Sequence, residues 1–305
     1  MLLFWIGFNA FILVMLALDL FVVGRRGREL KLGEAIFWSG LWIALAFAFA
    51  LVVYFWHGRT PALQFITGYI IEVSLSADNL FLFLLIFRYF NVPGEHQHKV
   101  LFWGIIGALA IRGIFIATGV ELIQRFDWIT YVFGAFLVYS GAKLLRHGQG
   151  EINPEKNPVL RLFRRFFSVT RDYEDGHFFV RRDGWYATPL FVVLLVVETT
   201  DVILAVDSVP AVLAVTLNAF IVYTSNVFAI LGLRSMYFAL AGLMDKFHYL
   251  HYGLSLILIF VGLKMLGEHY VDIPTEWTLG TVIAVLAISV GASRIFPKRA
   301  GGLPS

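Results

Sequence analysis

Two apolar stretches of this 305-residue chain carry acidic residues in the same arrangement. Residues 68–79 read GYIIEVSLSADN, and residues 197–211 read VETTDVILAVDSVPA. In each stretch one acidic residue precedes an aspartate by six positions. The acidic residues of the two stretches are Glu72, Asp78, Glu198, Asp201 and Asp207. Because carboxylates are rare in such apolar sequence, these stretches decide both the fold and the candidate site.

The composition around these stretches is that of a membrane protein. Hydrophobic residues make up 59% of the chain and charged residues 15%, with a mean hydropathy of +0.78. Soluble domains carry about 25% charged residues. Apolar runs of about 20 residues, long enough to cross a bilayer as helices, recur along the chain. We therefore expect an all-α polytopic fold of about nine transmembrane helices. The expected spans are roughly residues 2–24, 34–56, 62–88, 99–121, 127–147, 188–214, 218–243, 248–268 and 276–296.

The basic residues indicate how the chain is oriented in a cell inner membrane. With the N-terminus outside, the outer loops hold only Arg59 and Arg125, and Arg112, Arg234 and Lys264 lie within spans. All other lysines and arginines then fall on the inner side, as the positive-inside rule requires. We therefore expect an outer N-terminus and a cytoplasmic C-terminus.

An internal repeat organises the middle of the chain. Residues 131–143 (YVFGAFLVYSGAK) match residues 252–264 (YGLSLILIFVGLK), and Arg112 matches Arg234 at nearly the same offset. Together with the two acidic stretches, these matches define two copies of three spans. An odd number of spans makes the second copy enter the membrane from the opposite side, as in many secondary transporters. The expected organisation of the single membrane domain (1–305) is repeat one at about 62–147, a cytoplasmic loop at 148–187, repeat two at about 188–268, and peripheral spans at 2–24, 34–56 and 276–296.

The five central carboxylates are costly unless they are compensated. Each costs about 3 kcal/mol at the bilayer centre, so the set costs roughly 15 kcal/mol. One interpretation is purely structural, with ion pairs to Arg112 and Arg234. Five acids against two arginines leave an excess, which must be protonated, hydrated or bound to a cation. The excess favours an ion pathway.

Geometry predicts that the two acidic spans are broken. Residues six apart lie about 120° apart around a straight helix, so the paired acids would not face one point. Unwinding near Asp78 and Asp207 would let them converge, and Pro210 removes a helical hydrogen bond close to Asp207. Neighbouring side chains that add oxygen donors are Ser74, Ser76, Asn79, Thr199, Thr200 and Ser208.

The donor set narrows the choice of ion. The chain has no cysteine, and all eight histidines fall in loops or at span ends, so the core offers only oxygen ligands. Such ligands suit Mg²⁺, Ca²⁺ and Mn²⁺ better than Cu or Zn. Binding of protons or Na⁺ alone stays the alternative. Nothing in the sequence supports nucleic-acid binding, and the absence of cysteine excludes dithiol redox chemistry by this chain alone.

The long inner loop contains two predicted elements. Residues 157–167 (NPVLRLFRRFF) place apolar side chains at helical spacing among arginines, which predicts an interfacial helix on anionic lipid. Asp183-Gly184 between apolar runs favours a hairpin turn. The alternative is a solvated linker with an apolar patch.

These residues together resemble the TerC/Alx family of membrane proteins. The resemblance is carried by residues 68–79 and 197–211, by residues 223–234 (YTSNVFAILGLR), and by residues 177–181 (HFFVR) in the loop. It implies export of Mn²⁺, although tellurite resistance and redox modulation are also described for the family. It also implies that acidic residues of the paired motifs are metal ligands. Carried over to this chain, these are Glu72, Asp78, Asp201 and Asp207, with Glu198 adjacent.

We therefore expect an inverted-repeat transporter, not an enzyme, that exchanges Mn²⁺ for H⁺ or Na⁺. Its expected partners are the metal ion, the coupling ion and the lipid bilayer, with no tightly bound cofactor and Ca²⁺ as a possible second substrate. The expected metal site is Glu72, Asp78, Asn79, Glu198, Asp201, Asp207 and Ser208, with Arg112 and Arg234 as ion-pair or gating residues. The alternatives are a membrane redox modulator, a tellurite-resistance protein and a Ca²⁺/H⁺ exchanger.

Overall fold

The protein folds into a bundle of long apolar helices. The computed structural model describes residues 6–12, 14–15, 32–147, 157–241, 249–271 and 273–295, without the side chains of Asp78 and His147. Its main helices are α2 (Leu32–His57), α3 (Arg59–Tyr89), α4 (Gly94–Arg125), α5 (Trp128–His147), α7 (Pro189–Leu213), α8 (Ala219–Leu231), α9 (Leu233–Ala241), α10 (Leu250–Gly267) and α11 (Thr275–Ile295). The predicted all-α polytopic membrane fold is confirmed.

Within the described residues, seven single helices are long and apolar enough to span a membrane. The α8–α9 pair passes the same test as one bent span, which makes eight. These eight coincide with the spans expected from residue 34 onward. The first expected span, 2–24, lies mostly outside the described residues, of which 6–12 and 14–15 are helical. Helices that hydrogen-bond their own backbone are the structure that a lipid environment favours for such sequences.

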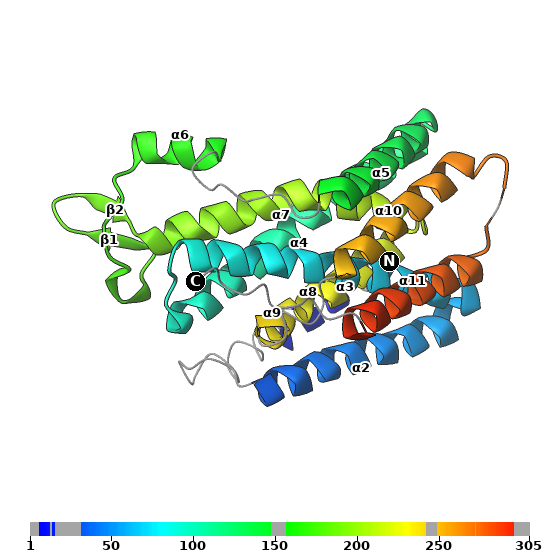
Figure 1. Ribbon diagram of the computed structural model, residues 1–305, viewed down its shortest axis with the longest axis horizontal. Helices are drawn as coiled ribbons and strands as arrows, with labels where there is room; N and C mark the ends of the chain where they lie inside the picture. Colours follow the sequence, from blue (N-terminus) through cyan, green and yellow to red (C-terminus); the bar gives the residue numbers. More distant parts are fainter. Residues whose placement is uncertain are drawn as a thin grey trace, which may run out of the picture.

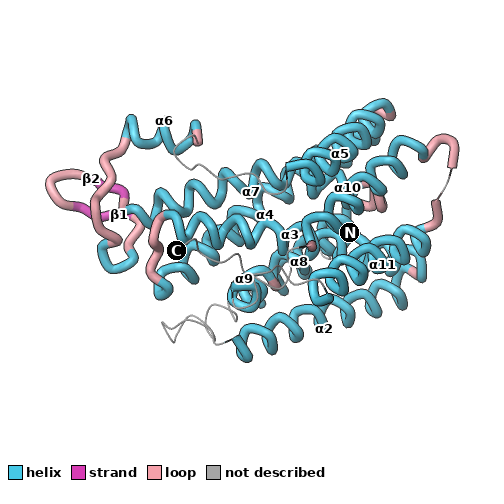
Figure 2. Tube along the Cα trace, in the orientation of Figure 1, coloured by secondary structure: helices cyan, strands magenta, loops and turns pink. Residues whose placement is uncertain are grey.

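Helix α3 lies at the centre of the bundle (Figures 1 and 2). It packs against α2, α7, α8, α9, α10 and α11. Helix α2 lies at the edge and exposes large apolar side chains such as Phe37, Leu51 and Phe55. This difference is expected for a membrane bundle, in which peripheral helices present apolar surface to lipid and central helices can carry polar groups. The acidic stretch of predicted repeat one is therefore on a central helix of the bundle.

Helices α5 and α10 approach each other through small residues. A Cβ added at Gly134 would lie 3.0 Å from the carbonyl oxygen of Gly262, and one at Gly141 would lie 2.7 Å from that of Ser255. The repeat alignment relates Gly134 to Ser255 and Gly141 to Gly262. If the two repeats are exchanged, the contact of Gly134 with Gly262 becomes the contact of Ser255 with Gly141. This is the relation expected of a two-fold interface. The residue numbers run in opposite directions along the two helices, as expected for a pair related by inversion, and the repeat itself stays a prediction.

The predicted breaks in the two acidic spans are wrong. Both α3 and α7 are continuous helices through Asp78 and Asp207. Pro210 lies in the last turn of α7, where the helix ends three residues later, so it interrupts little helix. The observed break is instead between α8 and α9, with a bend of 43° at Gly232. Glycine is a poor helix former, and this bend immediately precedes Arg234.

The described part of the inner loop, residues 157–188, forms a small folded unit at one end of the bundle (Figure 1). It comprises α6 (Pro158–Phe166), a 3₁₀ turn η2 (Glu174–Gly176), and strands β1 (Phe179–Arg181) and β2 (Trp185–Ala187). The strands pair antiparallel, which confirms the hairpin predicted from Asp183-Gly184. The unit docks on the start of α4, since Lys99 donates to the carbonyl of Gly176 at 2.6 Å.

Candidate metal-transport site

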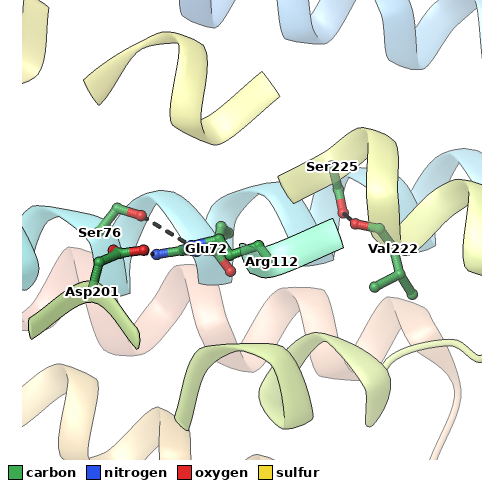
Figure 3. A network of polar contacts seen from close by, with 6 residues as sticks. All are labelled: Glu72, Ser76, Arg112, Asp201, Val222 and Ser225. Atoms are coloured by element: carbon green, nitrogen blue, oxygen red, sulfur yellow. Dashed lines mark hydrogen bonds and ion pairs between the residues drawn. The ribbon is translucent and has the colours of Figure 1, made fainter. Parts of the chain in front are cut away.

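One carboxylate from each repeat meets a single guanidinium in the middle of the bundle. Glu72 on α3 and Asp201 on α7 both form ion pairs with Arg112 on α4. Nη1 of Arg112 pairs with Oε1 of Glu72, and Nη2 lies 3.3 Å from Oδ1 of Asp201. Figure 3 shows the three side chains pointing toward one another from three helices. Ser76, one turn after Glu72, donates a hydrogen bond to Oε1 of Glu72 at 3.5 Å.

This cluster is almost fully enclosed. Glu72, Arg112 and Asp201 are exposed by 0%, 1% and 4%. With all three groups ionised, two carboxylates face one guanidinium, which leaves one negative charge in excess. Oε2 of Glu72 and Oδ2 of Asp201 are buried and have no hydrogen-bond partner in the described part of the structure. Buried carboxylate oxygens without partners are costly, so the cluster favours a further cation or proton.

Glu198 lies next to this cluster, three residues before Asp201 on α7. Its carboxylate contacts α4 at Gly107, where an added Cβ would fall 2.1 Å from Oε1. No hydrogen bond or ion pair of Glu198 is found among the described residues. Gly107 therefore creates the space that this carboxylate occupies. No sequence pattern pointed to Gly107, because glycines are common in membrane helices.

Asp207 lies on another face of α7 and does not join the cluster. Its Oδ1 accepts a hydrogen bond of 2.7 Å from Ser140 on α5. Lys143, one turn after Ser140, is close enough to act electrostatically on the Asp207 carboxylate. Because α7 is unbroken between them, the six-residue spacing turns Asp207 about 120° away from Asp201. The single site expected from all four motif acids is therefore not assembled in this conformation.

The other predicted site residues fall around the same region. Asn79 and Ser208 are buried, and the Ser208 hydroxyl has no partner within the described residues. The side chain of Asp78 lies outside the described part. Arg234 is buried and lines, with Asp201, a small cavity of about 20 Å³ whose other walls are apolar. A space of that size holds about one water molecule.

Among the described side chains, no three histidine or acidic groups are gathered closely enough to hold a metal ion. Arg112 forms the ion pairs that the structural interpretation expects, and it contacts two acids rather than one. The assignment of the seven predicted residues to a metal site stays a prediction.

Two further polar residues of this region, Ser140 and Asn226, were not predicted from the sequence. Asn226 on α8 is 1% exposed, and neither its oxygen nor its nitrogen has a hydrogen-bond partner in the described residues. An asparagine inside an apolar run was the available signal, since buried amides are costly when unpaired. Ser140 gave no such signal, because serine is common in membrane helices.

A polar cavity opens at the end of the bundle opposite the loop unit. Its volume is about 430 Å³, and it lies among the ends of α3, α4, α5, α7, α10 and α11. Its walls include Gln64, Lys264, Glu268 and Glu276. Lys264 donates to the carbonyl of Ala214, at the end of α7, at 3.2 Å. The cavity thus reaches the ends of both acidic helices.

The loop unit contacts the acidic helix directly. Asn157, the N-cap of α6, accepts hydrogen bonds from two backbone amides of α6 and donates to Thr199 on α7 at 2.7 Å. Phe163 of α6 and Phe179 of β1 both pack on Phe191. Thr199 immediately follows Glu198, so this loop touches the helix beside the candidate site.

Comparison with known proteins agrees with this architecture. Residues 57–300 match the family described as "Integral membrane protein TerC family". The chain is 49% identical over 297 residues to "Uncharacterized membrane protein STKORF319" of Myxococcus xanthus, covering 97% of this chain and 93% of that protein. It is 45% identical over 298 residues to "Putative membrane-bound redox modulator Alx" of Escherichia coli strain K12, covering 94% and 92%. No solved structure matches. The chain therefore belongs to the TerC family of integral membrane proteins.

Proposed function

We propose that this protein is a secondary transporter that exports Mn²⁺ from the cytoplasm. The observation that supports this most strongly is the meeting of Glu72 and Asp201, equivalent positions of the two repeats, in the middle of the bundle. Each retains a buried oxygen without a partner in the described residues. Substrate sites at the interface of inverted repeats are the common arrangement in secondary transporters.

The chemistry of the donors supports a hard divalent cation. Carboxylate and hydroxyl oxygens form the cluster, from Glu72, Ser76 and Asp201, and the carboxylate of Glu198 lies one turn from Asp201 on α7. A dication bound there would balance both carboxylates of the pair, whereas one guanidinium balances only one. Ca²⁺ accepts the same oxygen ligands, so a Ca²⁺/H⁺ exchanger is the second candidate.

The two ends of the bundle support alternating access. With the loop unit on the cytoplasmic side of the inner membrane, as the basic residues predict, the 430 Å³ cavity faces outward. The acidic cluster then lies between this outer cavity and the cytoplasmic ends of α4 and α7. Export against a gradient needs a coupling ion, for which H⁺ and Na⁺ are the candidates.

The name of the Escherichia coli relative suggests redox modulation instead. This chain contains no cysteine, so exchange of a dithiol and a disulfide within it is excluded. Metal export accounts for the buried carboxylates, which a redox role leaves without a purpose. We therefore place metal transport first.

Ion uptake into everted membrane vesicles tests the proposal. Export from cells corresponds to uptake into such vesicles, so vesicles with the protein should accumulate Mn²⁺ above vesicles without it. Ca²⁺ should compete and Zn²⁺ should not, because the site offers oxygen ligands alone. Collapsing a proton or a sodium gradient in separate samples identifies the coupling ion. Uptake equal to that of control vesicles for every metal would refute the function.

Cysteine labelling tests the orientation, and the natural chain needs no prior cysteine removal. A cysteine at Thr60, which lines the outer cavity, should react in intact cells with a reagent that does not cross membranes. A cysteine at Asp183 in the hairpin should react only after the membrane is opened. The opposite pattern would reverse the transport direction proposed here.

A further inference from the structure

Arg112 occupies a position that suits a transported cation. Its guanidinium lies between the two repeat-equivalent carboxylates and is the basic group that both of them contact among the described residues. It comes from α4, a third helix, so the contact joins α3 and α7 through one side chain. The residue is 1% exposed, which keeps water from replacing this contact.

A transporter that returns across the membrane without its metal ion needs a positive charge beside the two carboxylates. Two ionised carboxylates held close together in a medium of low dielectric constant repel each other and lose their hydration. A metal ion removes this cost when it is bound, but the transporter must also return without metal. The positive charge of Arg112 can balance one carboxylate and attract the second during that part of the cycle.

Another acid, Glu198, provides a position to which the guanidinium can move. Glu198 has no hydrogen bond or ion pair in the described residues, and it lies against Gly107, five residues before Arg112 on the same helix. Glu198 also lies three residues before Asp201 on α7, and residues three apart on a helix are surface neighbours with about 5–6 Å between their Cβ atoms. The guanidinium that contacts Asp201 therefore needs to move about one helical turn along α7 to reach Glu198.

We propose that Arg112 is a tethered counter-cation that holds Glu72 and Asp201 together in the metal-free carrier and gives way to the metal ion. On metal binding, the guanidinium moves from the two carboxylates toward Glu198. This inference rests on the proposed function and adds the step by which the empty site is kept neutral enough to return. Arg112 is a positioning residue in this account, because it acts through the carboxylates rather than as a ligand.

Equilibrium binding separates this role from a structural one. In Arg112→Gln the competitor for the carboxylates is lost, so purified protein should bind Mn²⁺ about tenfold or more tightly. Turnover in vesicles should fall, since the empty site then carries two uncompensated charges. A merely structural arginine would weaken binding when removed, because the site would loosen.

Two further variants complete the experiment. Arg112→Lys keeps one charge, so it supports folding, but lysine cannot bridge two carboxylates as a planar guanidinium does. It should bind Mn²⁺ several-fold more tightly than the natural protein. Arg125→Gln is the matched control on α4, because Arg125 is exposed and pairs with Glu121. It should leave affinity unchanged.

The outcomes separate the counter-cation role of Arg112 from the transport function on which it rests. If the natural protein binds and exports Mn²⁺ while both Arg112 variants bind it equally or more weakly, the counter-cation role is wrong and the transport function stands. If the natural protein binds neither Mn²⁺ nor Ca²⁺, the transport function itself fails. Tighter binding in Arg112→Lys and unchanged binding in Arg125→Gln would support the role even if Arg112→Gln does not fold.

Discussion

Asp201 and Asp207 lie on one helix, yet they meet different kinds of partner. Asp201 is buried and pairs with the charged Arg112, together with Glu72 from the other repeat. Asp207 is half-buried and accepts a hydrogen bond from the neutral hydroxyl of Ser140. The difference shows that α7 has two acidic faces, of which the Asp201 face contacts an acid of the other predicted repeat, Glu72, through Arg112. Among the described side chains, charge compensation across the predicted repeats is therefore found at this one point.

The largest effect should come from removing one charge at that point. Glu72→Gln and Asp201→Asn should each reduce Mn²⁺ export roughly a hundredfold or more, because a dication shell loses one of its charged ligands. Stability in detergent should hold, since Arg112 keeps its contact with the remaining carboxylate. Vesicle uptake and the melting temperature measure the two effects. Export at the natural rate in either variant would remove the acid concerned from the site.

Asp207→Asn should have a smaller effect, about tenfold on export. The amide oxygen can still accept the hydrogen bond from Ser140, and the residue lies away from the Arg112 cluster. Asp78, its repeat equivalent, should show a loss of similar size when changed to asparagine. Uptake assays on both variants measure this. A loss as large as that of Asp201→Asn would mean that all four acids act as one site during transport.

Gly107→Ala should reduce export several-fold by moving Glu198. The added Cβ would lie 2.1 Å from the present position of the Glu198 carboxylate, which must shift. Gly104→Ala is the matched control, since its Cβ would meet Val197 at an ordinary 3.5 Å. Uptake by the two variants, normalised to their amount in the membrane, gives the comparison. Equal rates would show that the position of Glu198 does not matter for transport.

The smallest effect on export should come from a substitution in the loop unit. Asn157→Ala removes the N-cap of α6 and the hydrogen bond to Thr199. Loss of such a cap costs about 1 kcal/mol, and the change is expected to be local to the loop unit. Export should change by less than about twofold, and proteolysis of the loop should become faster. A large loss of export would instead show that the loop controls the acidic face of α7.

The apolar runs and their charges were sufficient to predict the bundle. Eight expected spans coincide with helices, and the hairpin follows from Asp183-Gly184, because these features depend on local sequence. The helix break was misplaced for a physical reason. Pro210 falls in the last turn of α7, where little helix follows it, whereas Gly232 falls inside the apolar run 218–243.

The acidic residues of the site could be predicted from the sequence, but the side chains that contact them could not. The six-residue spacing correctly predicts that the paired acids lie on different faces of an unbroken helix. The helices were wrongly predicted to unwind because the acids were expected to converge on one site. That Arg112 contacts both Glu72 and Asp201 depends on how α3, α4 and α7 pack, which no local pattern records. Gly107 and Ser140 act only through side chains on α7, so their sequence positions carried no signal.

A titration of the purified protein with Mn²⁺, with free Mn²⁺ followed by electron paramagnetic resonance, tests the central claim most directly. The claim is that Glu72 and Asp201 bind one transported dication together. The natural protein should bind Mn²⁺ in a saturable way, and Asp201→Asn should lose this binding while Arg112 keeps Glu72 as a partner. Saturable binding of equal affinity in Asp201→Asn, with the protein folded, would contradict the claim.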